Sequence, residues 1–263
     1  MALINHRPPI SAASLHSRRN NPSARILCFS NRSNSVEAVV GLKSSKKEYS
    51  PGVIDDIFLN VFRSKMAQVI GWDSEKPGYD GLIELAHRLM VGRSNSEATN
   101  AAVRILGSLF PPLLLDLFKK LVSPIAGGKV ASEMVARATA ISCQWLMGTC
   151  TVNSVDLPNG FSWSSGVFVE KCKYLEESKC VGVCINTCKL PTQAFFKEYM
   201  GIPLVMEPNF SNYSCQFKFG LLPPPTEDDS ALKEPCLQIC PTANRRREIV
   251  KSSTTYVSKC PKA

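Results

Sequence analysis

Apolar residues recur every three or four positions through residues 50–148, which is the spacing of helices with one buried face. The first such stripe runs from Ile54 to Phe62. Ser50-Pro51 precedes it as a start signal, and Gly71 follows it as a stop. Further helices are expected over residues 80–91, 96–109, 113–122 and 130–147. The first half of the chain is therefore predicted to be helical.

The pattern changes after residue 150. Residues 166–175 alternate apolar and polar side chains and are rich in strand-forming types, so they predict a strand. Residues 179–200 indicate a helix that is interrupted at Pro191. Two more short strands are expected over residues 203–207 and 214–219. The fold class that follows is α+β, with an N-terminal helical lobe packed on a small C-terminal cysteine-rich βαββ lobe.

The N-terminal leader differs in composition from the rest of the chain. Residues 1–36 contain five arginines and seven serines but no Asp or Glu, which is typical of chloroplast or mitochondrial transit peptides. We expect residues 1–45 to be a cleaved transit peptide, with chloroplast import favoured over mitochondrial import. The alternative is a basic tail that binds an acidic partner. Residues 46–150 would then form the helical lobe and residues 151–263 the cysteine-rich lobe, together one compact domain.

Charge and hydropathy narrow the class of partner. The chain carries 31 basic and 22 acidic residues, a formal charge of +9, but without the five leader arginines the balance is only +4. No stripe of basic and aromatic residues accompanies the basic run 245–247, so nucleic acid is not expected as a partner.

Residues 113–122 are interrupted by Asp116 and two lysines and do not predict a transmembrane span. Burial of this helix and peripheral contact with plastid membranes are the two interpretations. The acidic, proline-rich residues 223–229 predict a solvated loop.

Cysteines are the candidate chemistry, because ten of the eleven lie in the second half of the chain, which has no histidine. Such a region can build a disulfide framework, a zinc–sulfur site or thiolate-bound iron. A reducing organelle disfavours disulfides, and the three-residue gaps favour iron, either a single ion or an iron–sulfur cluster, over zinc. The candidate metal ligands are Cys180, Cys184, Cys188, Cys215, Cys236 and Cys240.

Helix geometry limits how the first three of these cysteines can act together. On a regular helix Cys180, Cys184 and Cys188 would stack about 6 Å apart, so the outer two would be about 12 Å apart and could not share one ion. Either the helix breaks within the motif, for which Gly182 is the candidate, or only two of the three are ligands. Cys143, Cys150 and Cys172 are interpreted as core fillers.

Four segments together resemble a known family. They are Val169-Glu-Lys-Cys-Lys-Tyr-Leu-Glu-Glu-Ser-Lys-Cys-Val-Gly-Val-Cys-Ile-Asn-Thr-Cys-Lys-Leu-Pro-Thr-Gln193, Met200-Gly-Ile-Pro-Leu-Val-Met-Glu-Pro-Asn209, Ser214-Cys-Gln-Phe-Lys-Phe-Gly220 and Pro235-Cys-Leu-Gln-Ile-Cys-Pro241. Their sequences resemble the plant plastid β-carotene isomerase family of strigolactone biosynthesis. The resemblance implies an iron-containing isomerase that interconverts all-trans-β-carotene and 9-cis-β-carotene. The resemblance further implies that this isomerisation is the first step towards carlactone and strigolactones, and that the protein thereby contributes to the control of shoot branching. It supplies no assigned catalytic residue.

The residue chemistry is compatible with that activity. A conjugated double bond can rotate when its bond order is lowered, and one-electron exchange with a sulfur-ligated iron centre achieves this. An apolar tunnel would then select the bond; its candidate walls are Phe58, Phe62, Leu114, Phe118, Trp145 and Phe195. The alternative is a non-enzymatic plastid iron–sulfur electron carrier or redox scaffold. The large helical lobe favours the enzyme, since a carrier does not need it.

Overall fold

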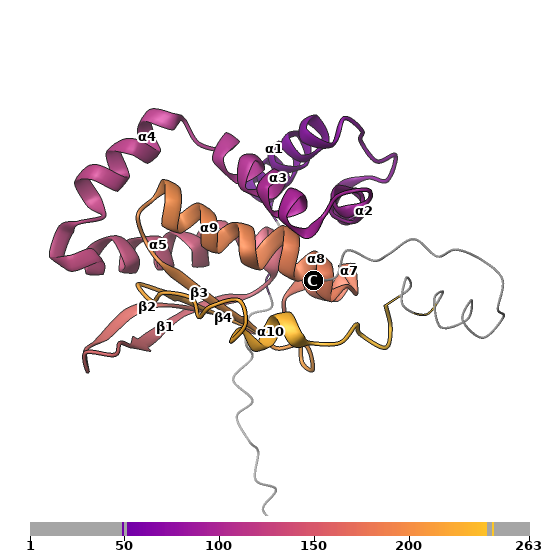
Figure 1. The fold of residues 1–263 in the computed structure, drawn as a ribbon. Coiled ribbons are helices and arrows are strands. Elements are labelled where there is room, and N and C mark those ends of the chain that lie inside the picture. The colour runs from indigo at the N-terminus through magenta and orange to yellow at the C-terminus, as the bar shows by residue number, and fades with distance from the viewer. Residues whose placement is uncertain (1–48, 50–51, 241–243, 245–263) are drawn as a thin grey trace, which may run out of the picture. The chain divides into compact units, whose positions relative to one another are not determined.

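Helices occupy most of the first half of the chain, and a four-stranded sheet lies in the second half (Figure 1). The computed structural model describes residues 49, 52–240 and 244, so the leader, Cys28 and the run 245–247 lie outside the described residues. The helical elements are α1 (Val53–Ile70), α2 (Gly78–Met90), α3 (Asn95–Ser108), α4 (Pro112–Leu117), η1 (Phe118–Val122), η2 (Ile125–Gly128), α5 (Lys129–Ser142), α6 (Gln144–Met147), α7 (Lys173–Ser178), α8 (Val181–Val183), η3 (Cys184–Lys189), α9 (Leu190–Tyr199) and α10 (Ser230–Lys233). The strands are β1 (Cys150–Asp156), β2 (Ser162–Val169), β3 (Leu204–Pro208) and β4 (Cys215–Phe219). The predicted α+β class is confirmed.

The first three helices follow the apolar spacing of the sequence. Helix α1 stops at Gly71, whose left-handed backbone (φ 75°) suits glycine, as predicted. Its start was predicted at Ser50, but the N-cap is Gly52. Helix α3 begins with a capping box in which the side chains and backbone amides of Ser94 and Glu97 bond reciprocally. The predicted face of α2 is completely buried: Leu82, Leu85, Ala86 and Leu89.

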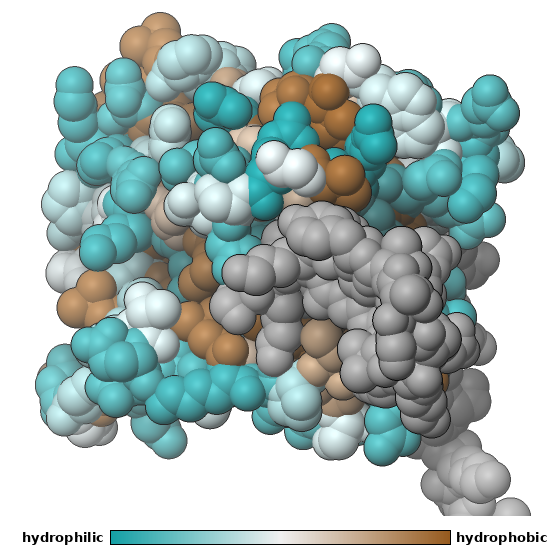
Figure 2. Space-filling model, turned by 45° about the vertical axis from the view of Figure 1, so that its right-hand side comes forward, coloured by the Kyte–Doolittle hydropathy of each residue, from teal (hydrophilic) through white to brown (hydrophobic). Residues whose placement is uncertain are grey.

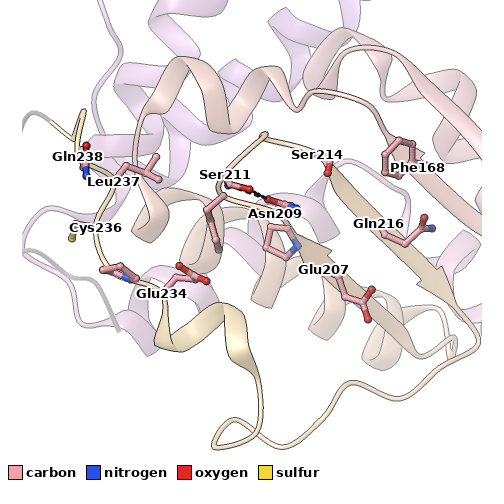
Figure 3. Close-up of a pocket in the computed structure, with 13 residues that line it drawn as sticks. Phe168, Glu207, Asn209, Ser211, Ser214, Gln216, Glu234, Cys236, Leu237 and Gln238 are labelled. Carbon is pink, nitrogen blue, oxygen red and sulfur yellow. Dashed lines mark hydrogen bonds between the residues drawn. The ribbon is translucent and has the colours of Figure 1, made fainter.

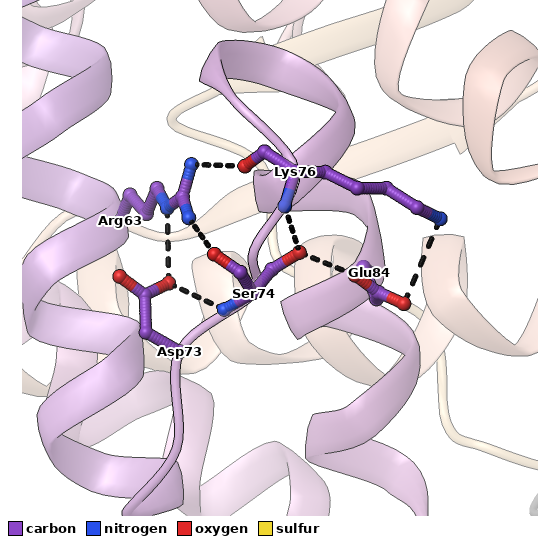
Figure 4. A network of polar contacts seen from close by, with 5 residues as sticks. All are labelled: Arg63, Asp73, Ser74, Lys76 and Glu84. Carbon is purple, nitrogen blue, oxygen red and sulfur yellow. Dashed lines mark hydrogen bonds and ion pairs between the residues drawn. The ribbon is translucent and has the colours of Figure 1, made fainter.

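A polar network fixes the loop between α1 and α2 (Figure 4). The Arg63 guanidinium donates to the Asp73 carboxylate at 3.0 Å, to the Lys76 carbonyl at 2.7 Å and to the Ser74 carbonyl. A Cβ at Gly81 would lie 2.4 Å from both Arg63 Nη1 and the Lys76 carbonyl oxygen, so this close approach requires glycine. The loop is held by one partly buried cation, Arg63, from the preceding helix.

The later helices of the first half depart from the predicted boundaries. The predicted helix over 130–147 is broken at Cys143 (φ −108°, ψ 7°), which separates α5 from α6. The predicted helix over 113–122 is present but continues from α4 into the π-helical segment η1. No single helix among the described residues is long and apolar enough to cross a membrane. By length and composition α3 and α4–η1 satisfy this test only as a pair, which is bent by 93° at the break.

The sheet is antiparallel throughout, with strand order β1-β2-β4-β3. Alternate residues of β4, namely Cys215, Phe217 and Phe219, are buried, whereas the side chains between them are half-buried. Helix α5 packs against β1, β2 and β4, and α9 against β3, so the core lies between one face of the sheet and these helices (Figure 1). Apolar side chains also reach the surface among polar ones in the view of Figure 2.

Strand β1 was not predicted, so the second half is ββαββ and not βαββ in its order of elements. The pairing register of β1 with β2 shifts between Asn153 and Val155, and this bulge breaks the alternation by which a strand is recognised. The strand predicted over 166–175 is also displaced. It ends at Val169, and the residues after Cys172 form α7.

The cysteine-bearing helix does not break at Pro191. Segments α8, η3 and α9 follow one another with helical backbone angles, and Pro191 lies in the first turn of α9. Proline lacks an amide hydrogen and normally interrupts a helix. Here it directly follows the wider π-helical turns of η3, where the hydrogen-bonding register has already changed. The interruption predicted from the sequence was therefore wrong.

Candidate functional site

Four cysteines from three parts of the chain line one small buried cavity. Cys172 is the N-cap of α7, Cys184 and Cys188 lie in η3, and Cys215 begins β4. The backbone amide of Cys172 donates to the Tyr213 carbonyl at 2.7 Å, which ties the start of α7 to the segment before β4. The other lining residues are Met147, Tyr174, Leu175, Lys189, Met206, Pro208 and Phe217. We call Cys172, Cys184, Cys188 and Cys215 the cysteine cluster.

The local backbone decides which cysteines of the sequence motif act together. Cys180 has extended backbone angles (φ −139°, ψ 115°) and precedes α8, whereas Cys184 and Cys188 are both helical. The three residues therefore do not form one row. The helix starts after Cys180 and does not break at Gly182, which lies inside α8. Two of the three cysteines line the cavity, and Cys180 is buried outside its lining.

Burial controls the protonation of the cluster. It raises the pKa of Cys184 and of Cys215 well above the ordinary thiol value, and the neighbouring cysteines raise both further. The Lys189 ammonium opposes this in part, since it lowers the pKa of both thiols. Burial likewise raises the pKa of Cys172 and of Cys188. At neutral pH these groups are thiols, so a metal that bound them would have to displace their protons.

A buried ion pair lies beside the cluster. Lys189 is 1% exposed, and its ammonium is 2.5 Å from an Asp229 carboxylate oxygen and 3.4 Å from the Gln193 side-chain oxygen. The other Asp229 oxygen accepts a bond from the Ala231 amide, so the pair joins η3 to α10. Asp229 had been included in a solvated loop, but it is buried. Residues 227–229 are all acidic, and the sequence does not show that Asp229 is the one that pairs with a buried lysine.

The remaining predicted ligands lie outside this cavity lining. Cys236 lines a second cavity of about 690 Å³, together with Phe168, Glu207, Asn209 and Glu234 among others (Figure 3). Cys240 is buried at 2% exposure, but lines neither cavity. The structure thus brings Cys184, Cys188 and Cys215 together and adds Cys172, which sequence reasoning had assigned to packing. No spacing rule could have found Cys172, because it joins the cluster through tertiary contacts.

The cluster matches iron in the chemistry of its donors but not in their arrangement. Soft thiolates in a buried site are the usual ligands of iron–sulfur centres. Among the described residues, however, no three His, Cys, Asp or Glu side chains are placed so that they could hold a metal ion. The free volume of the cavity is about 10 Å³, room for about one water molecule. Iron would fit only if these side chains turned and the cavity widened.

The candidate tunnel residues fall into separate environments. Phe195 is buried in an aromatic group with Phe110, Phe196 and Tyr199, with ring centroids 5.5–5.8 Å apart. Phe62 meets Trp145 edge to face at 5.7 Å. Phe58 and Leu114 are 42% and 53% exposed. None of the six candidate wall residues lines either of the two cavities described above.

Comparison with known proteins places the cluster within a matched segment. Residues 145–228 match the model of a family described as "Beta-carotene isomerase D27-like, C-terminal". The chain is 34% identical over 192 residues to "Beta-carotene isomerase D27, chloroplastic" of Medicago truncatula, covering 73% of this chain and 75% of that protein. It is 37% identical over 171 residues to the protein of the same name from Arabidopsis thaliana, covering 65% and 63%. No solved structure matches. All four cluster cysteines, but neither Cys236 nor Cys240, lie in the matched segment.

Proposed function

The chain belongs to the β-carotene isomerase D27-like family, and from this premise we propose that it interconverts all-trans-β-carotene and 9-cis-β-carotene. It is an isomerase and a chloroplast protein, as expected from the sequence. The observation that carries the proposal is that the segment matched by the family model builds the cysteine cluster. We further propose that this reaction is the first step of strigolactone biosynthesis, on the strength of the four sequence segments quoted above.

Iron is the proposed cofactor, bound by cysteine thiolates. Of the six predicted ligands, support is strongest for Cys184, Cys188 and Cys215, because they face one cavity, and Cys172 is added to the proposed set. Cys180, Cys236 and Cys240 remain predicted ligands without such support. If these thiolates held iron, the metal would supply the one-electron chemistry that the isomerisation of a conjugated double bond can use.

The protein's own residues prepare a dry, weakly polar environment. Met206 and Phe217 contribute apolar surface around the thiols, which excludes water and strengthens nearby electrostatic interactions. The Tyr174 hydroxyl lies 2.8 Å from the Thr187 hydroxyl, which donates to the Val183 carbonyl at 2.7 Å, so the Tyr174 side chain beside the thiols is tied to the backbone of α8. The Lys189–Asp229 pair then fixes η3, which carries two of the cysteines.

The decisive assay is incubation of anaerobically purified protein with all-trans-β-carotene, followed by chromatographic separation of the isomers. We expect the 9-cis fraction to rise above that of a heat-matched blank. An unchanged 9-cis fraction in protein that contains iron would instead favour the electron carrier or redox scaffold. Because carotenes partition into bilayers, the proposal also includes peripheral contact with plastid membranes.

A further inference from the structure

Helix α4 and its continuation η1 expose an unusual amount of apolar surface. Leu113, Leu117 and Leu121 are 69%, 46% and 64% exposed. They are spaced four residues apart, so they lie on one side of the helix. Leu114 and Ile125 extend this surface. We call these five residues the α4 face.

The opposite side of the same helix is also apolar, and it contacts the protein. Leu115 is buried, and Phe118 and Val122 pack against the hydrophobic core. Asp116, Lys119 and Lys120 supply the polar part of the helix, so its apolar surface is wider than the part that packs against the protein. An apolar helix surface is normally covered by protein or lipid. This helix lies at one end of the molecule in Figure 1, away from α2 and α7, and its outer side is uncovered by other described residues.

Polar contacts hold the helix in this exposed position. The Lys119 ammonium donates to the Glu198 carbonyl at 2.5 Å, and the Ser123 hydroxyl donates to the Gly201 carbonyl at 2.9 Å. Both partners lie at the end of α9 or just after it. The α4 face is therefore presented by a fixed helix, anchored along one edge.

The charges beside the α4 face distinguish between possible occupants. Residues 112–132 contain three lysines and one acidic residue, Asp116, which gives a net charge of +2. Lys120 and Lys129 are exposed. Anionic lipid headgroups would complement these lysines, whereas a second copy docked by two-fold symmetry would bring lysines near lysines. Apolar side chains flanked by lysines are typical of helices that lie in a membrane interface.

We propose that the α4 face docks the protein on the surface of an anionic lipid bilayer, with its leucines inserted among the acyl chains and Lys120 and Lys129 at the headgroups. The proposal rests on the proposed function in one respect only: a substrate that is a hydrocarbon dissolved in membranes explains why the protein would bind a bilayer. Docking itself requires neither carotene nor iron. It can therefore be tested separately from isomerisation.

The test is co-sedimentation of the full chain with vesicles of phosphatidylcholine, with and without phosphatidylglycerol. The variant Leu117→Gln/Leu121→Gln should lower the partition coefficient at least about tenfold, because each inserted leucine contributes of the order of one such factor. The matched control is Val152→Gln/Leu222→Gln, which alters two exposed apolar residues elsewhere and should bind like the unaltered chain. All variants carry the same leader, so any leader contribution cancels.

The charge contribution is tested by Lys120→Glu/Lys129→Glu. This variant should lose about fivefold or more in binding per lysine on vesicles with phosphatidylglycerol and little on neutral vesicles. Thermal unfolding checks that each variant is folded. The proposal is overturned if the leucine variant binds as the unaltered chain does. It is also overturned if size-exclusion chromatography shows a dimer that this variant dissociates while vesicle binding stays absent.

Discussion

The sheet half and the helical half of the molecule place their unusual side chains in opposite ways. In the sheet half, Cys184, Cys215 and Lys189 are buried, although lysine is normally exposed. In the helical half, Leu113 and Leu121 are exposed, although leucine is normally buried. The difference indicates that the reaction takes place at the buried cysteine cluster, whereas the exposed α4 face makes contact with the membrane.

The strongest way to break this comparison is to remove a thiol from the enclosed site. Cys184→Ser should lower isomerisation more than about 100-fold, because loss of a ligand should exceed the 10–100-fold effect of outer-shell changes. The matched control is Cys143→Ser, which alters a half-buried thiol that is interpreted as core packing and lies outside the lining of the cysteine cluster's cavity, and it should retain activity. Equal activity in the two variants would show that the cluster is only packing.

The next largest effect should come from the buried ion pair. Lys189→Met leaves the Asp229 carboxylate buried without its cation, which should lower the free energy of unfolding by about 3–5 kcal/mol. The double variant Lys189→Met/Asp229→Asn should recover part of this loss, because it removes the stranded charge. Urea unfolding measures both. If the single and double variants are equally destabilised, the pair does not act as a unit.

The protonation state of the cluster gives a dependence on pH. Burial raises the pKa of Cys184 and Cys215 in the folded chain above the ordinary 9.0. The folded chain keeps these two thiols protonated at a pH at which the unfolded chain has already lost the protons. Their contribution to the free energy of unfolding is therefore fully present below pH 9.0, and it is lost as the pH rises towards the folded-state pKa values. The free energy of unfolding of the metal-free protein should fall by about 1.4 kcal/mol per pH unit for each such thiol. Urea unfolding of Cys184→Ala should show a shallower fall, and an unchanged slope would contradict the assignment.

The smallest effect is expected at the loop between α1 and α2, far in sequence from the cluster. Arg63→Ala removes the bonds to Asp73, Ser74 and Lys76 and should cost about 1–3 kcal/mol of stability. Lys76→Ala removes only an exposed pair with Glu84 and should cost less than about 1 kcal/mol. Isomerisation should survive in both variants. If either variant lost activity while remaining folded, the loop between α1 and α2 would contribute to the reaction, which contradicts the assignment of the chemistry to the sheet half.

The sequence predicted those parts of the fold whose signals are local. Helices α1 to α3 follow from apolar spacing, and the stop at Gly71 follows from its backbone freedom. Strand β1 escaped prediction because its bulge near Asn153 destroys the alternation on which recognition depends. The helix was wrongly predicted to be interrupted at Pro191, because the rule for proline does not take account of the π-helical turns that precede this residue.

The candidate site was predictable in kind and only partly in membership. The regular gap between Cys184 and Cys188 carries a signal, and Cys215 follows from its place in the family-like segment. Cys172 and Asp229 carry none, since each reaches the site through contacts between elements distant in the sequence. Tertiary packing, not spacing, decides which buried group has a partner.

The most direct measurement of the central claim is the iron content per chain of anaerobically purified protein, taken together with its visible absorption. The unaltered chain and Cys143→Ser should contain near-stoichiometric iron and show thiolate charge-transfer bands, and Cys184→Ser should lose both. Iron content and colour that are unchanged in Cys184→Ser, or an unaltered chain that is colourless and holds zinc or no metal, would contradict the claim that the cysteine cluster is an iron site.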